Sequence, residues 1–338
     1  MKTRQLDEQI IVNEAPQIPG LVFRKFRGES DFPAMLEVIN GANAEDDIDE
    51  STTLQDITHD YKYLENCDPT KDMLMAEVDG KLIGYTRVFW RKQEDGLTIY
   101  RTVGKLLPEK RRKGIGTAMF TWTENRLRNI AGGHTWPGRR SFQAGVAESE
   151  NGTIALLEKF GYQPARYFFM MKRLINDPLP EAPMPPGLEV RPALEEHIRQ
   201  IWDADNEAFK DHWGYVPTTE NNYLDWKGWS GFQPDLWKIA WDGDQVAGMV
   251  LNFIDRPENK EFNRLRGYTE GISVRRPWRK KGLARSLIVQ SINMFKEMGM
   301  TETALGVDSL NLSGALSLYE GVGYRNIKQY TTYRKPLD

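Results

Sequence analysis

Runs of apolar residues with two different spacings alternate along the second half of the chain. Leu236–Trp241 and Val246–Ile254 are short apolar runs separated by Asp242-Gly243-Asp244-Gln245, which predicts a β-hairpin. Apolar residues at helical spacing predict a helix after residue 282, with Leu283, Leu287, Ile288, Ile292, Phe295 and Met298 on one stripe. The same reading predicts strands at Leu188–Arg191, Tyr268–Val274, Thr303–Val307 and Ile327–Tyr333, and helices at Leu194–Phe209 and Ser313–Glu320.

The first half of the chain repeats this order of elements. Gly20–Arg24 returns as Gly187–Arg191, and Lys159–Tyr162 returns as Gly321–Tyr324. A basic, glycine-containing segment around Arg111 returns around Arg279. A hairpin turn at Asp79-Gly80 and a helix at Thr117–Asn129 complete the match. Three landmarks in the same order at similar spacing indicate a tandem duplication.

A proline-rich segment separates the two copies. Residues 176–187 hold five prolines, which exclude a helix or an inner strand and favour an extended spacer. We therefore predict an N-terminal domain over 1–175, a linker over 176–187 and a C-terminal domain over 188–338. An antiparallel start followed by strand–helix–strand predicts an α/β fold, each domain a mostly antiparallel mixed sheet flanked by helices.

Composition narrows the possible classes of protein. A chain of 338 residues suits two domains, and a net charge of −3 argues against a nucleic-acid binder. The single cysteine, Cys67, excludes an intramolecular disulfide and a cysteine-built zinc site, and no histidine spacing suggests a metal. No run of about 18 apolar residues occurs. We expect a cytoplasmic protein without a membrane partner.

The basic segments carry the most specific chemical signal. Arg111–Gly116 and Arg279–Ala284 each follow a predicted strand and open an amphipathic helix. Main-chain N–H groups at a helix start, backed by the helix dipole, suit a pyrophosphate, and the small residues let phosphate oxygens approach. A Walker loop and a dinucleotide fingerprint both fit worse, because neither copy has the required glycines and lysine. A basic nucleic-acid or localisation patch is the alternative.

At these residues both copies resemble the GNAT superfamily of acetyl-CoA-dependent N-acetyltransferases, whose signature is Arg/Gln-x-x-Gly-x-Gly/Ala. A second element of that family, a helix begun by Asn and leading to Tyr and Gly-Tyr, is present at 311–324. Two such domains in one chain resemble the mycothiol synthase type of arrangement. The resemblance implies an acetyl-CoA co-substrate and direct attack of an amine on the thioester.

The resemblance also assigns the residues that would hold acetyl-CoA. In the second copy the pantetheine arm would lie along Ile272, Ser273 and Val274, and a main-chain N–H near Val274 would polarise the thioester carbonyl. Asn311 would contact that arm or cap its helix. The loop residues at the pyrophosphate would be Arg279, Lys280, Lys281, Gly282, Leu283, Ala284 and Arg285. Their counterparts in the first copy are Gly104, Lys105 and Leu106, with Arg111, Arg112, Lys113, Gly114, Ile115, Gly116 and Thr117.

Two proton transfers remain to be assigned. Glu270 is the carboxylate on the strand before the loop, so it is the candidate base; a solvated or salt-bridged strand glutamate is the alternative. Tyr319 matches the family's usual proton donor to the thiolate, although a tyrosine there could simply pack. In the first copy, counting along the sequence places Thr102 and Leu157 at these positions, so we expect that domain to be catalytically degenerate. Tyr162 or Tyr167 could replace the missing donor.

The acceptor is less well defined. In the second copy, Asp211 and the aromatic residues around 209–229 could enclose a small amine, although most of these rings are expected to pack the fold. The acidic segment 43–50 is either a solvated loop or a docking surface for a cationic acceptor. We expect N-acetylation of a small-molecule amine by a monomer. A protein N-acetyltransferase and a non-catalytic acyl-CoA sensor remain alternatives.

Overall fold

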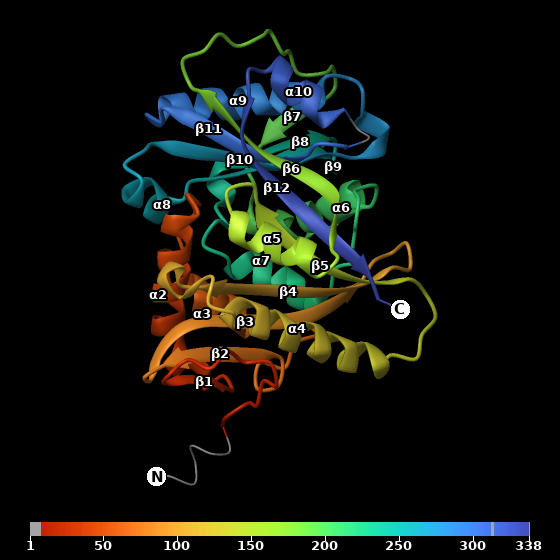
Figure 1. The fold of residues 1–338 in the computed structure, drawn as a ribbon. Helices are drawn as coiled ribbons and strands as arrows, with labels where there is room; N and C mark the ends of the chain where they lie inside the picture. Colours follow the sequence, from red (N-terminus) through yellow and green to blue (C-terminus); the bar gives the residue numbers. More distant parts are fainter. Residues whose placement is uncertain (1–7, 312–313, 338) are drawn as a thin grey trace. The chain divides into compact units, whose positions relative to one another are not determined.

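The computed structural model describes residues 8–311 and 314–337. The chain divides into two compact units, each drawn in Figure 1. Unit 1 contains the chain up to Ala165 together with the segment from Thr331 onward, and unit 2 contains Arg166–Tyr330. Unit 2 therefore includes the last ten residues of the predicted first domain, and unit 1 takes its last strand from the C-terminal segment.

Unit 1 follows the predicted order of strands and helices. Its elements are β1 (Leu21–Arg24), η1 (Gly28–Asp31), α2 (Phe32–Glu45), α3 (Leu54–Lys62), β2 (Met73–Val78), β3 (Lys81–Lys92), β4 (Thr98–Leu106), η2 (Pro108–Lys110), α4 (Ile115–Gly132), β5 (Arg140–Ala147) and α5 (Asn151–Lys159). The strands lie in the order β1-β2-β3-β4-β5, with the end of β12 (Arg325–Pro336) beside β5. Only β4 and β5 pair in parallel among the pairings of β1 to β5.

Unit 2 has largely the same order of strands and helices as unit 1, and its sheet also contains β6, a strand that the first repeat encodes. Its elements are β6 (Gln163–Leu174, from Arg166), β7 (Glu189–Arg191), η3 (Glu195–His197), α6 (Ile198–Phe209), α7 (Glu220–Gly228), η4 (Pro234–Leu236), β8 (Lys238–Asp242), β9 (Gln245–Phe253), α8 (Arg256–Glu261), β10 (Arg266–Val274), η5 (Arg276–Trp278), α9 (Leu283–Glu297), β11 (Glu302–Asp308), α10 (Ala315–Gly321) and the start of β12. The strand order is β6-β11-β10-β9-β8-β7, and β10 and β11 pair in parallel.

The mixed, mostly antiparallel sheets flanked by helices confirm the predicted fold class. Each strand predicted in the second repeat is present, with its ends shifted by at most two residues in most cases. Helices α7 and α8 were not predicted, because α7 buries none of its residues and α8 is a six-residue segment. Residues 178–185 form neither helix nor strand, as their prolines require.

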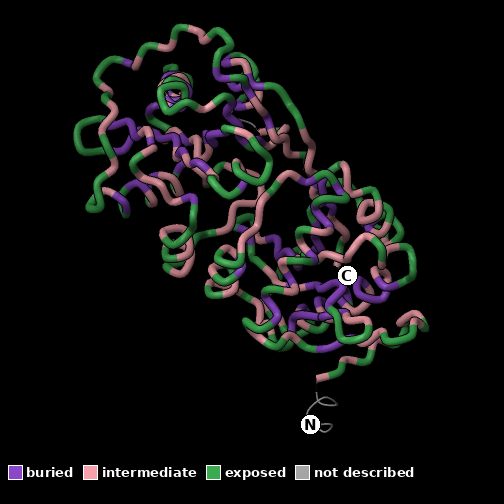
Figure 2. Tube along the Cα trace, turned by 90° about the vertical axis from the view of Figure 1, so that its left-hand side faces the viewer, coloured by how far each residue is buried: buried purple, intermediate pink, exposed green. Residues whose placement is uncertain are grey.

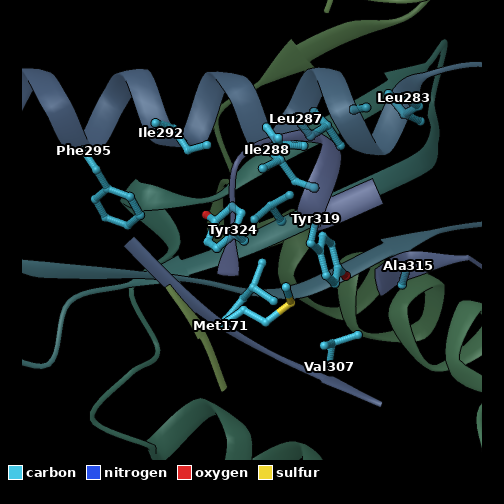
Figure 3. Packing of buried hydrophobic residues seen from close by; sticks show 14 of the residues in the cluster. Met171, Leu283, Leu287, Ile288, Ile292, Phe295, Val307, Ala315, Tyr319 and Tyr324 are labelled. Atoms are coloured by element: carbon cyan, nitrogen blue, oxygen red, sulfur yellow. The ribbon is translucent and has the colours of Figure 1, made fainter. Parts of the chain in front are cut away.

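The predicted stripe of α9 packs against the sheet of unit 2. Leu287, Ile288 and Ile292 are fully buried there with Phe295, in a cluster that also contains Tyr319 and Tyr324 (Figure 3). Met298, predicted on the same stripe, is 41 % exposed, because α9 ends at Glu297 and the chain turns away. In each unit the buried residues follow the strands and the inner faces of the helices, and exposed residues occupy the turns (Figure 2).

Candidate active site

In each unit the two parallel strands pair only at their beginnings. Strands β10 and β11 pair from Arg266–Glu302 to Tyr268–Ala304, although β10 continues to Val274 and β11 to Asp308. Strands β4 and β5 likewise stop pairing after Arg101. The carboxyl ends of these strands therefore leave main-chain groups without a partner in the neighbouring strand, which is where α/β sheets commonly bind ligands.

Strand β10 contains a bulge that β4 lacks. Its register against β9 shifts between Glu270 and Ser273, and Gly271 between them has a φ of 55°. A Cβ on Gly271 would lie 2.9 Å from Leu251, so the backbone there requires glycine. Strand β4 pairs with β3 without interruption. Because β10 has one residue more than β4 at this point, counting back along the sequence from the loop gives the wrong equivalent in β4, by one residue, for every position before the bulge.

The bulge corrects the predicted match between the repeats. Glu270 pairs with Leu251 in unit 2, and the pair at that place in unit 1 is Val103 with Arg87. Thr102 instead lies on the other face of β4, where its hydroxyl is 3.1 Å from that of Thr86. The residue of unit 1 that corresponds to Glu270 is thus Val103 rather than Thr102. Unit 1 lacks the carboxylate in either case.

Glu270 connects β10 to β11 beyond their last pair. Its Oε1 accepts a hydrogen bond of 2.6 Å from the main-chain N–H of Gly306. A Cβ on Gly306 would lie 3.4 Å from that oxygen, so the small residue permits the approach. Burial raises the pKa of Glu270 to about 7, and the Gly306 hydrogen bond offsets part of this rise. A carboxylate with this pKa can take up a proton near neutral pH.

Tyr319 lies on α10 with 6 % of its surface exposed. Its ring packs edge to face on Tyr324 at 6.4 Å between centroids, and Figure 3 shows it beside Val307 and Ala315. Burial, with a smaller effect of the nearby Glu270 carboxylate, raises the pKa of Tyr319 above its usual range. The phenol is therefore protonated at neutral pH and available as a donor.

The match of Tyr319 to Leu157 holds in three dimensions. The N–H of Tyr324 donates to the carbonyl of Tyr319 at 3.0 Å, and the N–H of Tyr162 donates to that of Leu157 at the same distance. Leu157 is fully buried, so unit 1 has an apolar contact where unit 2 has a phenol. Of the two replacements suggested by the sequence, Tyr162 is fully buried and Tyr167 lies within unit 2.

The basic loop has the backbone of an anion-binding turn in both units. Lys280 and Gly282 have φ values of 61° and 87°, and Arg112 and Gly114 have 60° and 84°. Gly282 is the N-cap of α9, and Gly114 is that of α4. Left-handed residues just before a helix turn successive N–H groups toward one point, which suits phosphate oxygens.

Arg279 and Arg111 are not available to a phosphate, because both are paired within the protein. The Nε of Arg279 donates to the carbonyl of Val274 at 2.8 Å, and its Nη1 bonds Asp211 at 2.6 Å. Arg111 makes the matching contacts, with Leu106 through Nε at 3.1 Å and with both oxygens of Asp46 at 2.7 and 2.9 Å. These side chains brace the loop. Any pyrophosphate contact there would come from the main chain and from the exposed Lys280, Lys281 and Arg285.

Asp211, which the sequence suggested could help to enclose an amine, has arginine partners within the protein. Asp211 already binds Arg276 and Arg279, and these hydrogen bonds hold the pKa of its carboxyl well below the usual range. The aromatic residues of the region pack on one another, as expected: Trp226 stacks on Trp237 at 5.3 Å and meets Phe232 edge to face at 4.9 Å.

Asn311 precedes rather than caps its helix. Helix α10 begins at Ala315 with Gly314 as the N-cap, and the N–H of Gly314 donates to the carbonyl of Asn311 at 3.3 Å. The predicted cap is therefore wrong in position by three residues. Residues 312 and 313 of the predicted motif lie outside the described part of the chain.

The corresponding sites of unit 1 are covered by protein. A Cβ on Gly114 would lie 3.3 Å from Pro16, whereas one on Gly282 would meet nothing within 4 Å. Beside β4, the Nζ of Lys105 lies 3.4 Å from a carboxylate oxygen of Glu150. Ser273 is the residue at the place of Lys105 in unit 2. The loop and strand of unit 2 are thus the more open of the two.

Asp205 is a functional candidate that the sequence reading missed. It lies on α6 beside the buried Ala204, and its Oδ1 is buried with no hydrogen-bond partner in the described residues. The Oγ of the neighbouring Ser273 is buried and unpartnered in the same way. Burial raises the pKa of Asp205 to about 7, and the capacity of the Ser273 hydroxyl to hydrogen-bond its carboxyl opposes this rise. The sequence did contain a signal for this residue, since Asp205 lies on the same helical stripe as the apolar Ile201 and Ala208.

Known proteins resemble this chain over almost its whole length. The model of the acetyltransferase (GNAT) family matches residues 42–162 and 197–324. A mycothiol acetyltransferase of Salinispora tropica is 24 % identical over 317 residues, which cover 90 % of this chain and 92 % of that protein. None of the helices in the described ranges has the length and apolar character needed to cross a bilayer.

Two solved structures show the same fold. A GCN5-related N-acetyltransferase from Sphaerobacter thermophilus superposes with a TM-score of 0.71 at 22 % identity, over 94 % of this chain and 95 % of that one. A tandem GNAT protein from the clavulanic acid biosynthesis pathway superposes with a TM-score of 0.65 at 14 % identity, over 94 % and 98 % of the two chains.

Proposed function

The chain belongs to the GNAT acetyltransferase family, and from that premise we propose that unit 2 transfers the acetyl group of acetyl-CoA to a small-molecule primary amine. The observation that carries this proposal is the placement of Glu270 and Tyr319 in unit 2 alone. Glu270 spans the two separated strands, and Tyr319 lies close enough for that carboxylate to influence its pKa. Unit 1 has Val103 and Leu157 at these places.

The residues around the loop fit acetyl-CoA. Gly282 leaves open space at the start of α9, and the exposed Lys280 and Lys281 can neutralise phosphate charge. We place the pantetheine arm along Ile272, Ser273 and Val274, where β10 no longer pairs with β11. A main-chain N–H near Val274 would polarise the thioester carbonyl.

The chemistry then needs two proton transfers. Glu270, with a pKa of about 7, accepts a proton from the acceptor's ammonium group. The neutral amine attacks the thioester carbonyl carbon, the carbon–nitrogen bond forms, and the carbon–sulfur bond breaks. The departing thiolate takes its proton from Tyr319, which burial keeps protonated at neutral pH. The second proton, which the nitrogen loses as the amide forms, passes to the Tyr319 phenolate, and Glu270 releases its proton to solvent, so both groups are restored.

The acceptor side of this proposal rests on Asp205 and on the relatives. Asp205 faces Ser273 of β10 with a buried oxygen that lacks a protein donor among the described residues. We assign it to hydrogen bonding with the acceptor's ammonium group, because a buried carboxylate oxygen requires a donor. The relatives named mycothiol acetyltransferase support a small-molecule acceptor. They do not identify the amine that this chain acetylates.

Tyr319→Phe tests the assignment. We expect calorimetry to show unchanged acetyl-CoA binding, and thiol-release assays with a panel of amines to show transfer slowed by about 10²-fold or more. Tyr162→Phe in unit 1 is the matched control and should leave transfer unchanged. Equal rates for Tyr319→Phe and the unmodified protein would remove Tyr319 from the mechanism. Acetyl-CoA binding without turnover of any amine or peptide would favour the sensor alternative.

A further inference from the structure

Three arginines of unit 1 surround one aromatic ring on the face of the sheet opposite α4. Arg87, Phe89 and Arg91 occupy every second position of β3 and so lie on one face of the strand. Phe89 pairs with Arg101 of β4. The guanidinium carbons of Arg87, Arg91 and Arg101 lie 5.8, 5.6 and 5.4 Å from the centre of the Phe89 ring. We call these four residues the Phe89 cluster. Strands β3 and β4 lie side by side in Figure 1.

Donors of the Phe89 cluster lack acceptors. The Nε and Nη1 of Arg87 and the Nε of Arg101 are buried, and no acceptor for them occurs in the described residues. Burial, followed by the charges of Arg91, Arg334 and Arg87, lowers the pKa of Arg101 to about 10. No carboxylate is among these influences. Buried guanidinium groups are normally held by carboxylate or phosphate oxygens, so this cluster has the electrostatics of an anion site.

The second repeat shows that the fold does not require these arginines. Leu251 occupies the place of Arg87, and the register of β9 and β10 puts Tyr268 in the place of Arg101. The ring at the place of Phe89 is kept as Phe253, which stacks on Tyr268 at 4.8 Å between centroids. Leu251, Phe253 and Tyr268 therefore serve the same strand positions in unit 2 without an arginine. The arginines of unit 1 are an addition that packing does not explain.

Mostly uncharged side chains surround the Phe89 cluster among the described residues. Arg87 lies over the ring of Tyr61 at 5.0 Å. Burial raises the pKa of that phenol, which keeps it neutral, although the charge of Arg87 and its hydrogen bond to the hydroxyl offset part of the rise. On the β5 side the Nε of Arg334 donates to the amide oxygen of Gln143 at 2.8 Å. The groups around the cluster are thus rings, a phenol and an amide. The carboxylate of Asp95 acts on Arg334 but is not among the charges that act on Arg101.

We propose that the Phe89 cluster binds the oxyanion group of a small ligand, a phosphate ester or a carboxylate. Arg87 and Arg101 would each donate hydrogen bonds to its oxygens, and Arg91 would add charge from the exposed side. This site is independent of the proposed acetyl transfer, which uses unit 2. It gives the catalytically degenerate unit a binding role of its own.

Calorimetric titration of the full chain with inorganic phosphate, and separately with citrate, tests the proposal. We expect saturable binding of at least one anion, weakened about tenfold or more in Arg101→Gln and in Arg87→Gln. Arg191→Gln is the matched control, since Arg191 also lies over a ring, that of Trp241 at 5.6 Å, but is paired with Glu189. Binding of phosphate alone would indicate a phosphate ester, and of citrate alone a carboxylate.

Thermal unfolding supplies a second readout, because removal of one of these arginines should not lower the stability of the ligand-free protein. Arg101→Gln removes a charge that its neighbours repel, so the ligand-free variant should be at least as stable as the unmodified protein. It should also lose the rise in Tm that the bound anion gives the unmodified protein. Arg101→Lys keeps the charge without the planar fork and should bind with intermediate affinity. No saturable binding of either anion, or equal binding by Arg101→Gln, overturns the proposal.

Discussion

Replacement of Glu270 by glutamine tests the proposed base through activity and stability at once. The amide cannot accept the acceptor's proton, yet its oxygen can still receive the Gly306 hydrogen bond, so the strands should keep their spacing. We expect kcat/KM to fall by about 10²–10⁴-fold. In the unmodified protein kcat/KM should rise with pH through about 7, because Glu270 must be ionised to act. That rise should be absent from the residual activity of the variant.

The same substitution should stabilise the fold at high pH. Burial raises the pKa of Glu270 from 4.5 to about 7, so the folded protein holds a proton that the unfolded chain has lost between these values. Each pKa unit corresponds to about 1.4 kcal/mol, so ionised Glu270 lowers the free energy of unfolding by at most about 3 kcal/mol. The effect is absent below pH 4.5 and complete above pH 7. Glutamine removes it.

Thermal unfolding at pH 5 and pH 8 measures this difference. Glu270→Gln should match the unmodified protein at pH 5 and exceed its Tm by a few degrees at pH 8. Glu302→Gln is a control for which we expect the opposite change in stability. Burial alone would raise the pKa of Glu302, but Lys172 at 3.0 Å and Arg266 at 2.7 Å outweigh it and lower that pKa. Its amide variant should therefore be the less stable protein at pH 8.

Two results would refute the reasoning. A Glu270→Gln variant that is less stable at pH 8 than at pH 5, relative to the unmodified protein, would show that the carboxylate stabilises the fold. Full activity of the variant would show that another group takes the proton. Loss of activity with an unchanged pH profile would assign the rise near neutrality to a different group, for which Asp205 is the candidate.

Three further substitutions probe the remaining assignments. Asp205→Asn should raise KM for the amine about tenfold or more with a smaller effect on acetyl-CoA binding, as measured by steady-state kinetics and calorimetry, whereas the exposed Asp203→Asn should change neither. Gly282→Ala should weaken acetyl-CoA binding, because its φ of 87° strains any side chain at the loop. Gly80→Ala, with a φ of 78° and open space around its Cβ in the β2–β3 turn of unit 1, is the control for backbone strain alone. Leu157→Tyr should create no activity in a protein that also carries Tyr319→Phe, since unit 1 still lacks the carboxylate and its loop is covered by Pro16; thiol release above background would contradict this.

The sequence alone predicts the elements of each repeat because their signals are local. Apolar spacing locates α9, and glycine with aspartate locates the hairpin turns. The sequence also identifies Leu157 as the equivalent of Tyr319 in the first copy, since the helix and the following turn have equal lengths in both copies. A count along the chain fails at Glu270, where Gly271 adds one residue to β10. A bulge depends on the partner strand, which no local pattern reveals.

The chemistry of charged side chains is harder to predict, because it depends on partners that are distant in sequence. Arg279 and Asp211 each looked available for a ligand, but they bind each other across a 68-residue separation. Asp205 looked like an ordinary helix residue until its burial against Ser273 was known. Like charges on adjacent strands, such as Arg87 and Arg101, cannot be seen as a cluster before the register of β3 and β4 is fixed.

The exchanged strand β6 makes the fold of unit 2 depend on residues from the first repeat. Strand β6, encoded by the first repeat, pairs with β11 of unit 2 over Phe168–Leu174. Its Met171 is 1 % exposed in the cluster that contains Tyr319, and the equally buried Arg173 donates from Nε to the carbonyl of Val322 at 2.8 Å. Without β6 the parallel strand that carries Gly306, the partner of Glu270, would become an open sheet edge. The proposed active site therefore depends on residues that the first repeat supplies, whether or not that repeat performs any chemistry.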